Sequence, residues 1–488
     1  MRLGDLLVQA GLVSVEEVAE ALRRQVAGGG RLGETLVSMG AIERKTLDAF
    51  LHRIPVEPRH ISDTGIEETE LLALMMKVIY SNHLQSVRQF AEAIKLPFTI
   101  VQEMVQMAID RQLLSTLGTR TSDNLFDMSY MLTDRGQQWA VDAFKQMSYA
   151  GPAPVTLKEF TQQVNIQKLT NERITPERIR KSFSGLDVEE RIVELSGPAL
   201  TSGRAMLLYG PPGNGKTSIA LRFAGVFSDV IYIPYAITVD GQIISVFDPS
   251  VHIRLSPADL SEDDTAAIFR REEYDARWVP CRRPFVVTGG ELTLGMLDLR
   301  YDPDGHFYEA PLHMKALGGC FLIDDFGRQL VSPTDLLNRW IVPLESRVDY
   351  LKLHTGKSFS IPFEELVIFS TNIEPEDLMD QAFLRRLPYK IEIGAPSPEL
   401  FRRIFEKEAA RQGLPLTDDL FTAIAYTIRQ EKGLELAAFQ PRFIIDQVMA
   451  SCRFMGLPPR FEPRFVLYAI DNLRVRRNTA PKAPARPA

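Results

Sequence analysis

The stretch Gly210-Pro-Pro-Gly-Asn-Gly-Lys-Thr217 decides the fold, because it is a complete G-x-x-x-x-G-K-[ST] phosphate-binding loop. The apolar run 205–209 before the loop predicts a short buried strand, and residues 218–224 after it predict a helix. The glycines let backbone N–H groups surround phosphate oxygens without a Cβ in the way. Lys216 is expected to place its charge on the β- and γ-phosphates, and Thr217 to offer its hydroxyl to Mg²⁺.

Length and composition indicate an ordinary globular protein of several domains, since 488 residues exceed what one core can hold. The net charge of −7 gives no overall attraction to nucleic acid or to an anionic membrane. The three cysteines are far apart and form no C-x-x-C, which argues against disulfides and zinc and favours a reducing compartment. No 18-residue apolar run and no signal-peptide pattern occur, so we expect no transmembrane segment and a cytoplasmic location.

The first half of the chain predicts two small helical domains. Residues 2–11 recur as residues 31–40, and a helical pattern follows each copy, at 14–25 and 43–52, which predicts a helical domain over 1–54. Helical patterns at 70–80, 87–94 and 99–114 are followed by two strand-like runs at 114–117 and 130–136. This order predicts a winged-helix domain over 66–150.

The second half predicts a multidomain arrangement around the phosphate loop. We expect a linker and entry segment over 151–195, an α/β core with a parallel sheet over 196–394, and an all-α lid over 395–475. Ser397 and Thr417 have N-cap patterns at the starts of two lid helices. The tail 476–488 is rich in Pro, Ala, Lys and Arg and is predicted to be disordered.

Polar residues follow two further apolar strands of the predicted core. The run 320–323 ends in Asp324 and Asp325, and the run 366–369 is followed by Asn372. A carboxylate at a strand tip beside a phosphate loop suits Mg²⁺, so Asp324 is the candidate metal ligand together with Thr217. Asp325 could orient the attacking water, and Asn372 could hold the water or the γ-phosphate.

Basic residues further along could also reach the phosphates. Arg385 and Arg386 precede a predicted strand at 389–393 and could act on a neighbouring subunit's γ-phosphate. Arg442 lies at the start of a predicted lid helix and could contact the phosphates from above. The predicted catalytic residues are Lys216, Asp325, Asn372, Arg385 and Arg386. The predicted ATP-binding residues are Gly210, Pro211, Pro212, Gly213, Asn214, Gly215, Lys216, Thr217, Ser218 and Arg442.

Over about residues 180–475 the sequence resembles the AAA+ ATPase module. The resemblance identifies 210–218 as Walker A, 320–325 as Walker B, Asn372 as sensor 1, Arg385 or Arg386 as the arginine finger and Arg442 as sensor 2. It implies ATP and Mg²⁺ as cofactors, a homo-oligomeric ring such as a hexamer, and a protein partner that is remodelled or assembled. A hairpin-like run at 350–361 is similar to the pre-sensor-1 hairpin clade, which includes the MoxR-type ATPases, and to chaperone-like ATPases associated with pilus assembly.

One position departs from the AAA+ pattern, because the family usually has Asp-Glu where this chain has Asp324-Asp325. Aspartate is one methylene shorter, so its carboxylate would lie about 1 Å or more further back, a misplacement that can cost much of the rate. The sequence therefore predicts slow hydrolysis unless the backbone moves to compensate. Measurable turnover that is lost in Lys216→Ala is the expected result.

The run 2–25 resembles the MshEN-type N-terminal domain of type II secretion and type IV pilus ATPases, which binds cyclic di-GMP in some members. The resemblance implies ligand-facing roles for Arg2, Leu3, Gly4, Leu7, Gly11, Leu22 and Gln25. The second copy ends in Ile54 where the pattern has Gln, and a winged helix follows instead of a second such subdomain. A helical module that docks a protein is the alternative and is favoured.

The charges of the winged-helix segment argue against DNA as a partner. The expected recognition helix exposes mainly neutral and acidic side chains, such as Gln102, Glu103 and Asp110, and the wing offers only Arg120. DNA affinity depends on neutralising phosphates, which this face cannot do.

The leading hypothesis is an ATPase that remodels or assembles a protein partner, in secretion or pilus biogenesis by the resemblance. Three alternatives remain. They are an ATP-dependent switch or scaffold with little hydrolysis, a cyclic di-GMP-responsive regulator and a DNA-linked regulator. A hairpin predicted around Asp240-Gly241 is either a pore-facing substrate loop or an ordinary structural turn.

Overall fold

The computed structural model describes residues 4, 7–8, 12–28, 32–44, 46–47, 54–119, 128–255 and 274–473. Arg2, Leu3 and Gly11, the wing residue Arg120, the acidic stretch 262–264 and the predicted tail lie outside these residues. Within the described ranges, no helix combines the length and the apolar character that crossing a membrane requires.

A five-stranded parallel sheet forms the centre of the molecule, in the order β16-β4-β15-β12-β9. The strands are β4 (Met206–Tyr209), β9 (Phe285–Thr288), β12 (Cys320–Ile323), β15 (Leu366–Ser370) and β16 (Tyr389–Glu392). The strands expected from the apolar runs at 205–209, 320–323, 366–369 and 389–393 are confirmed. Because all strands run in one direction, Asp324 and Asn372 come to the same edge of the sheet.

The three central strands, β4, β15 and β12, are buried on both faces, which is why they read as continuous apolar runs. Successive residues of one strand enter different cores: Leu207 packs on one face with Trp340 and Phe369, and Leu208 packs on the other with Phe223. The helices that supply these cores are α10 (Pro176–Ser182), α11 (Glu190–Ser202), α12 (Lys216–Phe223), α13 (Leu312–Lys315), α14 (Pro333–Arg339), α15 (Ile341–Ser346), α16 (Pro375–Leu378) and α17 (Gln381–Leu384). Short 3₁₀ turns lie at Leu169–Asn171, Ala224–Val226 and Leu294–Leu297.

A second five-stranded sheet, in the order β10-β11-β7-β6-β3, joins the core to the N-terminal part of the chain. Its strands are β3 (Val155–Thr156), β6 (Ala236–Val239), β7 (Gln242–Ser245), β10 (Arg300–Asp302) and β11 (Phe307–Glu309). The expected hairpin is present: Asp240 and Gly241 both have positive φ, 49° and 74°, the conformation of the two-residue turns that suit twisted strands. The strands of the hairpin lie within this sheet, and its exposed turn residue Asp240 pairs with the exposed Lys357 at 3.2 Å.

Two further strand pairs complete the α/β part. β5 (Ile231–Pro234) pairs with β8 (Trp278–Cys281), and β13 (Val348–Lys352) forms an antiparallel hairpin with β14 (Ser358–Pro362). The hairpin expected at 350–361 is therefore present, immediately before β15.

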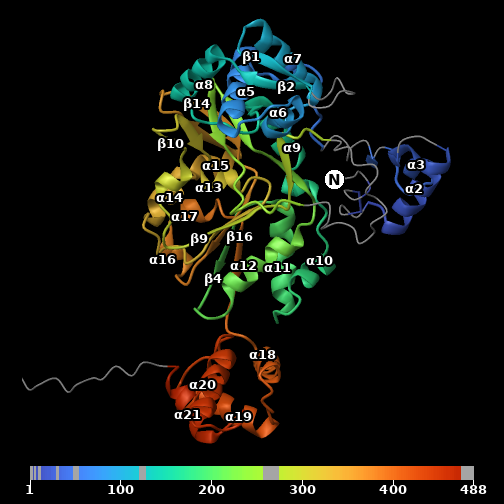
Figure 1. The fold of residues 1–488 in the computed structure, drawn as a ribbon. Coiled ribbons are helices and arrows are strands. Elements are labelled where there is room, and N and C mark those ends of the chain that lie inside the picture. The colour runs from blue at the N-terminus through green and yellow to red at the C-terminus, as the bar shows by residue number, and fades with distance from the viewer. Residues whose placement is uncertain are drawn as a thin grey trace, which may run out of the picture.

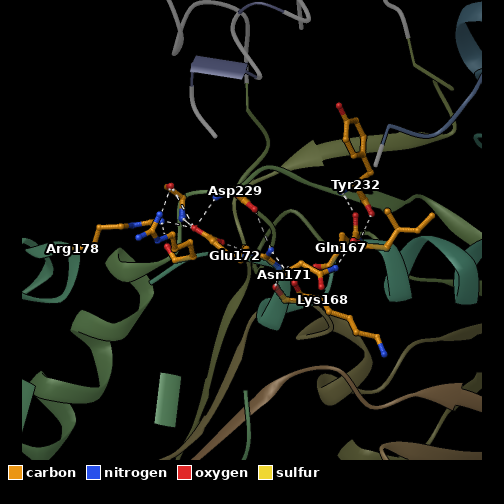
Figure 2. A network of polar contacts seen from close by, with 12 residues as sticks. Gln167, Lys168, Asn171, Glu172, Arg178, Asp229 and Tyr232 are labelled. Atoms are coloured by element: carbon orange, nitrogen blue, oxygen red, sulfur yellow. Dashed lines mark hydrogen bonds and ion pairs between the residues drawn. The ribbon is translucent and has the colours of Figure 1, made fainter. Parts of the chain in front are cut away.

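Glu172 lies in a network of polar contacts within the entry segment (Figure 2), and its buried ion pair with Arg283 joins this segment to the amino edge of the parallel sheet. α9 (Leu157–Ile166) leads to Glu172, whose carboxylate pairs with Arg283 at 2.9 Å and with Arg178 at 2.6 Å. Arg283 also donates to the carbonyl oxygens of Gln167 at 2.9 Å and Gly318 at 2.6 Å. Burial raises the pKa of Glu172, but Arg283 and the other donors outweigh burial and lower it below its usual range.

The helical unit formed by α5 to α8 lies at the other end of the molecule from the lid (Figure 1). It contains η1 (Ile61–Thr64), α5 (Glu68–Asn82), α6 (Val87–Ile94), α7 (Phe98–Asp110), β1 (Leu114–Thr119), β2 (Met128–Leu132) and α8 (Asp134–Gln146). The helix expected over 99–114 ends earlier, at Asp110, because Gln112 has a left-handed φ of 59° and Leu114 begins a strand. Ser148 ties the unit to the second sheet through a 2.8 Å backbone hydrogen bond to Gly305.

Four helices form the lid, as expected: α18 (Pro398–Arg411), α19 (Asp418–Tyr426), α20 (Gln440–Phe454) and α21 (Pro463–Asp471), with a π-helical turn at Thr427–Glu431. Ser397 and Thr417 cap α18 and α19 by accepting backbone N–H groups, which confirms the N-cap predictions. At the N-terminal end of the chain, α2 (Val15–Gly28) and α3 (Leu32–Ser38) belong to a separate small apolar cluster.

Candidate nucleotide-binding site

The phosphate loop joins β4 to α12 at the carboxyl edge of the parallel sheet. Gly215 caps α12 with a φ of +87°, and an added Cβ there would meet no atom within 4 Å, so the loop has open space on that side. At Gly210 an added Cβ would lie 2.5 Å from the carbonyl oxygen of Ile393, so only glycine allows β16 to approach this closely. The backbone N–H groups at the start of α12 thus remain available to anionic oxygens.

Lys216 is buried within its own loop. Its Nζ donates to the carbonyl oxygens of Gly210 at 2.8 Å and Pro211 at 2.9 Å. Burial lowers the pKa of Lys216, and the carboxylates of Asp325 and Asp324 oppose that change. Phosphate oxygens could replace the two carbonyl acceptors with stronger, charge-assisted hydrogen bonds.

Thr217 and Asp324 meet, although 107 positions separate them in the sequence. The Thr217 hydroxyl lies 2.8 and 3.0 Å from the two carboxylate oxygens of Asp324. A hydroxyl and a carboxylate at the foot of a phosphate loop form a hard-oxygen donor set that fits Mg²⁺, which is usually bound by one or two carboxylates plus phosphate oxygens and waters. The described residues contain no group of three or more His, Cys, Asp or Glu side chains suited to a metal.

Asp325 and Asn372 also meet at the sheet edge. Asn372 Nδ2 donates to Asp325 Oδ1 at 3.0 Å, and the Asp325 side chain is exposed. Asp325 has a left-handed φ of 49°, which non-glycine residues adopt rarely. The Gln329 amide, which the sequence patterns did not single out, hydrogen-bonds the backbone of this turn.

The two arginines after α17 have different surroundings. Arg386 is half-buried, and its Nε lies 2.6 Å from Glu345 Oε1 on α15. Arg385 is exposed at the C-cap of α17. Of the two, Arg385 is the side chain that solvent, or another chain, can reach directly.

The lid contacts the phosphate loop through residues other than the expected one. Arg442 lies on α20 with a side chain that is 78% exposed and 3.7 Å from Asp446. Instead, the Ala438 N–H donates to Asn214 Oδ1 at 3.2 Å, and the Phe439 N–H donates to the Gly213 carbonyl at 2.9 Å. The Phe439 ring lies over Gly213, where an added Cβ would be only 2.3 Å from it.

A pocket of about 130 Å³ lies beside the phosphate loop, between the core and the lid. Apolar side chains from α11, α12 and α18 line it, namely Ile192, Ile219, Leu400 and Ile404. Asn214 from the loop, Gly394 after β16 and Ala438 from the lid complete its wall. The charged residues Asp187, Glu189, Arg191 and Glu392 also line it. The apolar part of the wall would suit one face of a flat heterocyclic base. The sequence patterns missed this pocket because its wall comes from segments far apart in the chain.

The residues of the N-terminal resemblance are only partly described. Leu7 is fully buried in its small apolar cluster, and Gly4 packs against Val18 and Leu32. Leu22 and Gln25 are half-buried. Leu7 therefore serves the core of this unit, and cyclic di-GMP binding by the remaining residues stays a prediction.

Sequence comparison gives partial matches to ATPases. The chain is 36% identical over 84 residues to the type IV pilus assembly ATPase PilB of Myxococcus xanthus, which covers 17% of this chain and 15% of PilB. It is 41% identical over 80 residues to the ribosome biogenesis ATPase RIX7 of Saccharomyces cerevisiae, covering 14% of this chain and 10% of RIX7. The chain thus spans only a small part of the length of these curated relatives. Residues 397–472 match a family described as a domain of unknown function, DUF8689, which coincides with the lid.

Among solved structures, NtrX from Brucella abortus matches with a TM-score of 0.35 and 13% identity over 62% of this chain and 56% of that chain. A RuvB mutant from Thermotoga maritima has a TM-score of 0.31 and 15% identity over 63% of this chain and 73% of that one. Likeness this distant does not define a function. What the fold and the site define together is an α/β phosphate-loop core around a parallel sheet, in a chain that shares sequence with ATPases over parts of its length.

Proposed function

We propose that the chain is an AAA+ ATPase that binds ATP with Mg²⁺ and hydrolyses it to drive the remodelling or assembly of a protein partner. The observation that carries this proposal is the pair of contacts at one sheet edge, Thr217 to Asp324 and Asn372 to Asp325, directly beside Lys216. These side chains come from the start of α12 and from the ends of β12 and β15, and packing the apolar strands alone does not require polar partners there.

Each side chain has a defined task in this proposal. Lys216 and the N–H groups at the start of α12 bind and orient the phosphates, and Thr217 with Asp324 would hold Mg²⁺, which neutralises charge on them. Asp325 accepts a proton from the attacking water, and Asn372 orients both. The pocket beside Asn214 would take the base. Catalysis on this plan is positioning plus charge stabilisation.

The primary test is a steady-state phosphate-release assay on the full chain. Lys216→Ala should lose turnover and ATP affinity, whereas Lys158→Ala, an exposed lysine on α9, should retain both. Absence of ATP turnover in the wild-type chain, alone and assembled with ATP, would contradict the proposal.

We further propose that the active form is a homo-oligomeric ring in which Arg385 completes the site of a neighbouring subunit. The support is its exposure, whereas Arg386 already pairs with Glu345 in the same chain. Arg385→Ala should lower turnover with ADP affinity unchanged, and in mixed rings the variant should lower the turnover of active subunits by more than simple dilution does. If Arg386→Ala alone has that effect, the assignment reverses.

A further inference from the structure

The turn that follows β12 has an unusual backbone. Asp325 has a φ of 49°, and Gly327, two residues later, has a φ of 103°. Glycine adopts such angles without strain, but aspartate does so only when its surroundings hold it there. Something in this chain must therefore stabilise Asp325 in the left-handed conformation.

The Gln329 side chain supplies three hydrogen bonds to this turn. Its Nε2 donates to the carbonyl oxygens of Asp324 at 2.8 Å and Asp325 at 3.1 Å, and its Oε1 accepts the Gly327 N–H at 2.8 Å. Both ends of one amide are thus engaged with the backbone on either side of the strained residue. No other side-chain type of this length can donate and accept in this way.

The same turn is fastened to the tip of β15. The Phe326 N–H donates to the Ser370 carbonyl at 2.7 Å, and the Thr371 hydroxyl donates to the Phe326 carbonyl at 2.7 Å. Asn372, the next residue, donates to the Asp325 carboxylate at 3.0 Å. The direction of the Asp325 side chain is therefore set jointly by the turn and by β15.

We propose that Gln329 is a positioning residue that adapts the turn to the short side chain of Asp325. By holding Asp325 in the left-handed conformation, it brings the carboxylate to Asn372 although the side chain is one methylene shorter than glutamate. This inference rests on the proposed ATPase function. In the reaction, the Asp325 carboxylate takes a proton from water as the water oxygen bonds to the γ-phosphorus. The bond from that phosphorus to the β–γ bridging oxygen breaks, and its electron pair leaves with ADP.

The test compares Gln329→Leu, which removes the amide and ends in a branched apolar tip one bond closer to the backbone, with Leu330→Ala, a 78% exposed position on the same loop. The full chain is assayed for kcat, for the Kd of a fluorescent ADP analogue and for thermal midpoint. Gln329→Leu should lower kcat on the order of 10- to 100-fold, the scale of a misplacement near 1 Å. The ADP Kd should change less than about twofold, and Leu330→Ala should match wild type.

A second variant separates positioning from simple loop stability. Asp325→Glu should lower kcat, because the turn is built for the shorter side chain and the added methylene displaces the carboxylate from Asn372. A kcat above wild type in Asp325→Glu would overturn the inference. So would an unchanged kcat in Gln329→Leu, or a loss of kcat matched by equal loss of ADP affinity. A wild-type chain without turnover would instead overturn the proposed function on which the inference rests.

Discussion

The two edges of the parallel sheet carry polar groups of opposite character. At the amino edge, Arg283 and Glu172 are almost fully buried, with side chains 3% and 2% exposed, and their partners are fixed parts of the fold. At the carboxyl edge, Asp325 is exposed and Asp324 half-buried, and their partners are other members of the candidate site. The first edge holds the strands in place and the second presents groups to a ligand, as open α/β sheets generally do.

The largest effect is expected at the amino edge. Arg283→Ala leaves the buried Glu172 carboxylate without its main partner and should lower the free energy of unfolding by about 3–5 kcal/mol. Denaturant unfolding followed by fluorescence measures this, with Arg282→Ala, the exposed neighbour, as the matched control. A similar small loss in both variants would mean that the two edges do not differ in the way described.

At the carboxyl edge, Asp324→Ala should change activity rather than stability. Loss of the carboxylate that contacts Thr217 should lower Mg²⁺-dependent turnover on the order of 100- to 1000-fold, or about 3–4 kcal/mol. The free energy of unfolding without Mg²⁺ should change by less than about 1 kcal/mol, because the group is only half-buried. A large loss of stability with residual turnover intact would contradict the comparison.

Glu365 should make the amino edge sensitive to pH. Its side chain is fully buried and neither carboxyl oxygen has a hydrogen-bond partner within the described structure. Burial raises the pKa of Glu365 well above its ordinary value of 4.5; Arg347 opposes the shift, and Asp349 and Glu364 add to it.

The sign follows from linkage. The folded state holds the proton of Glu365 more tightly, so the associated stability is present below pH 4.5 and is lost as pH rises through the folded pKa. The slope is at most about 1.4 kcal/mol per pH unit for one proton. Glu365→Gln should flatten stability against pH above 4.5, measured by urea unfolding at a series of pH values. An equally steep decline in the variant would assign the slope to other groups.

The smallest effect concerns the lid contact. Asn214→Ala removes the acceptor of the Ala438 N–H and should weaken ADP binding by about 1 kcal/mol, or roughly fivefold. Isothermal calorimetry with ADP measures this directly. The exposed lid variant Arg442→Ala serves for comparison, and a larger loss there would restore the role first expected for Arg442.

The sequence predicted those features that depend on residues close together in the chain. The strand at 320–323 and the lid caps Ser397 and Thr417 were predictable because apolar runs and N-cap side chains act within a few residues. The meeting of Thr217 with Asp324 followed from parallel strands sharing one edge. The family resemblance suggested what each site residue does, and the sequence pattern itself indicated where along the chain each one lies.

Other features depend on tertiary contacts that no local pattern records. β9 was missed because its run 285–288 carries no flanking motif, and Gln329 because a glutamine in a loop is ordinary until its three partners are known. Phe439 and the pocket wall became visible only when the lid was placed against the loop. The end of α7 at Asp110 depended on Gln112 adopting a left-handed turn, which polar residues do only in context.

The shared wall of the pocket has a thermodynamic consequence. Because Leu400, Ile404 and Ala438 belong to the lid, a base bound there is enclosed only while the lid rests on Asn214 and Gly213. If a bound base raises the equilibrium constant for lid closure by some factor, lid closure must raise the affinity for the base by the same factor. The measured affinity then equals the intrinsic affinity scaled by the closed fraction. A partner that binds the lid, residues 397–472, and moves it away from the phosphate loop would therefore weaken nucleotide binding without contacting the nucleotide.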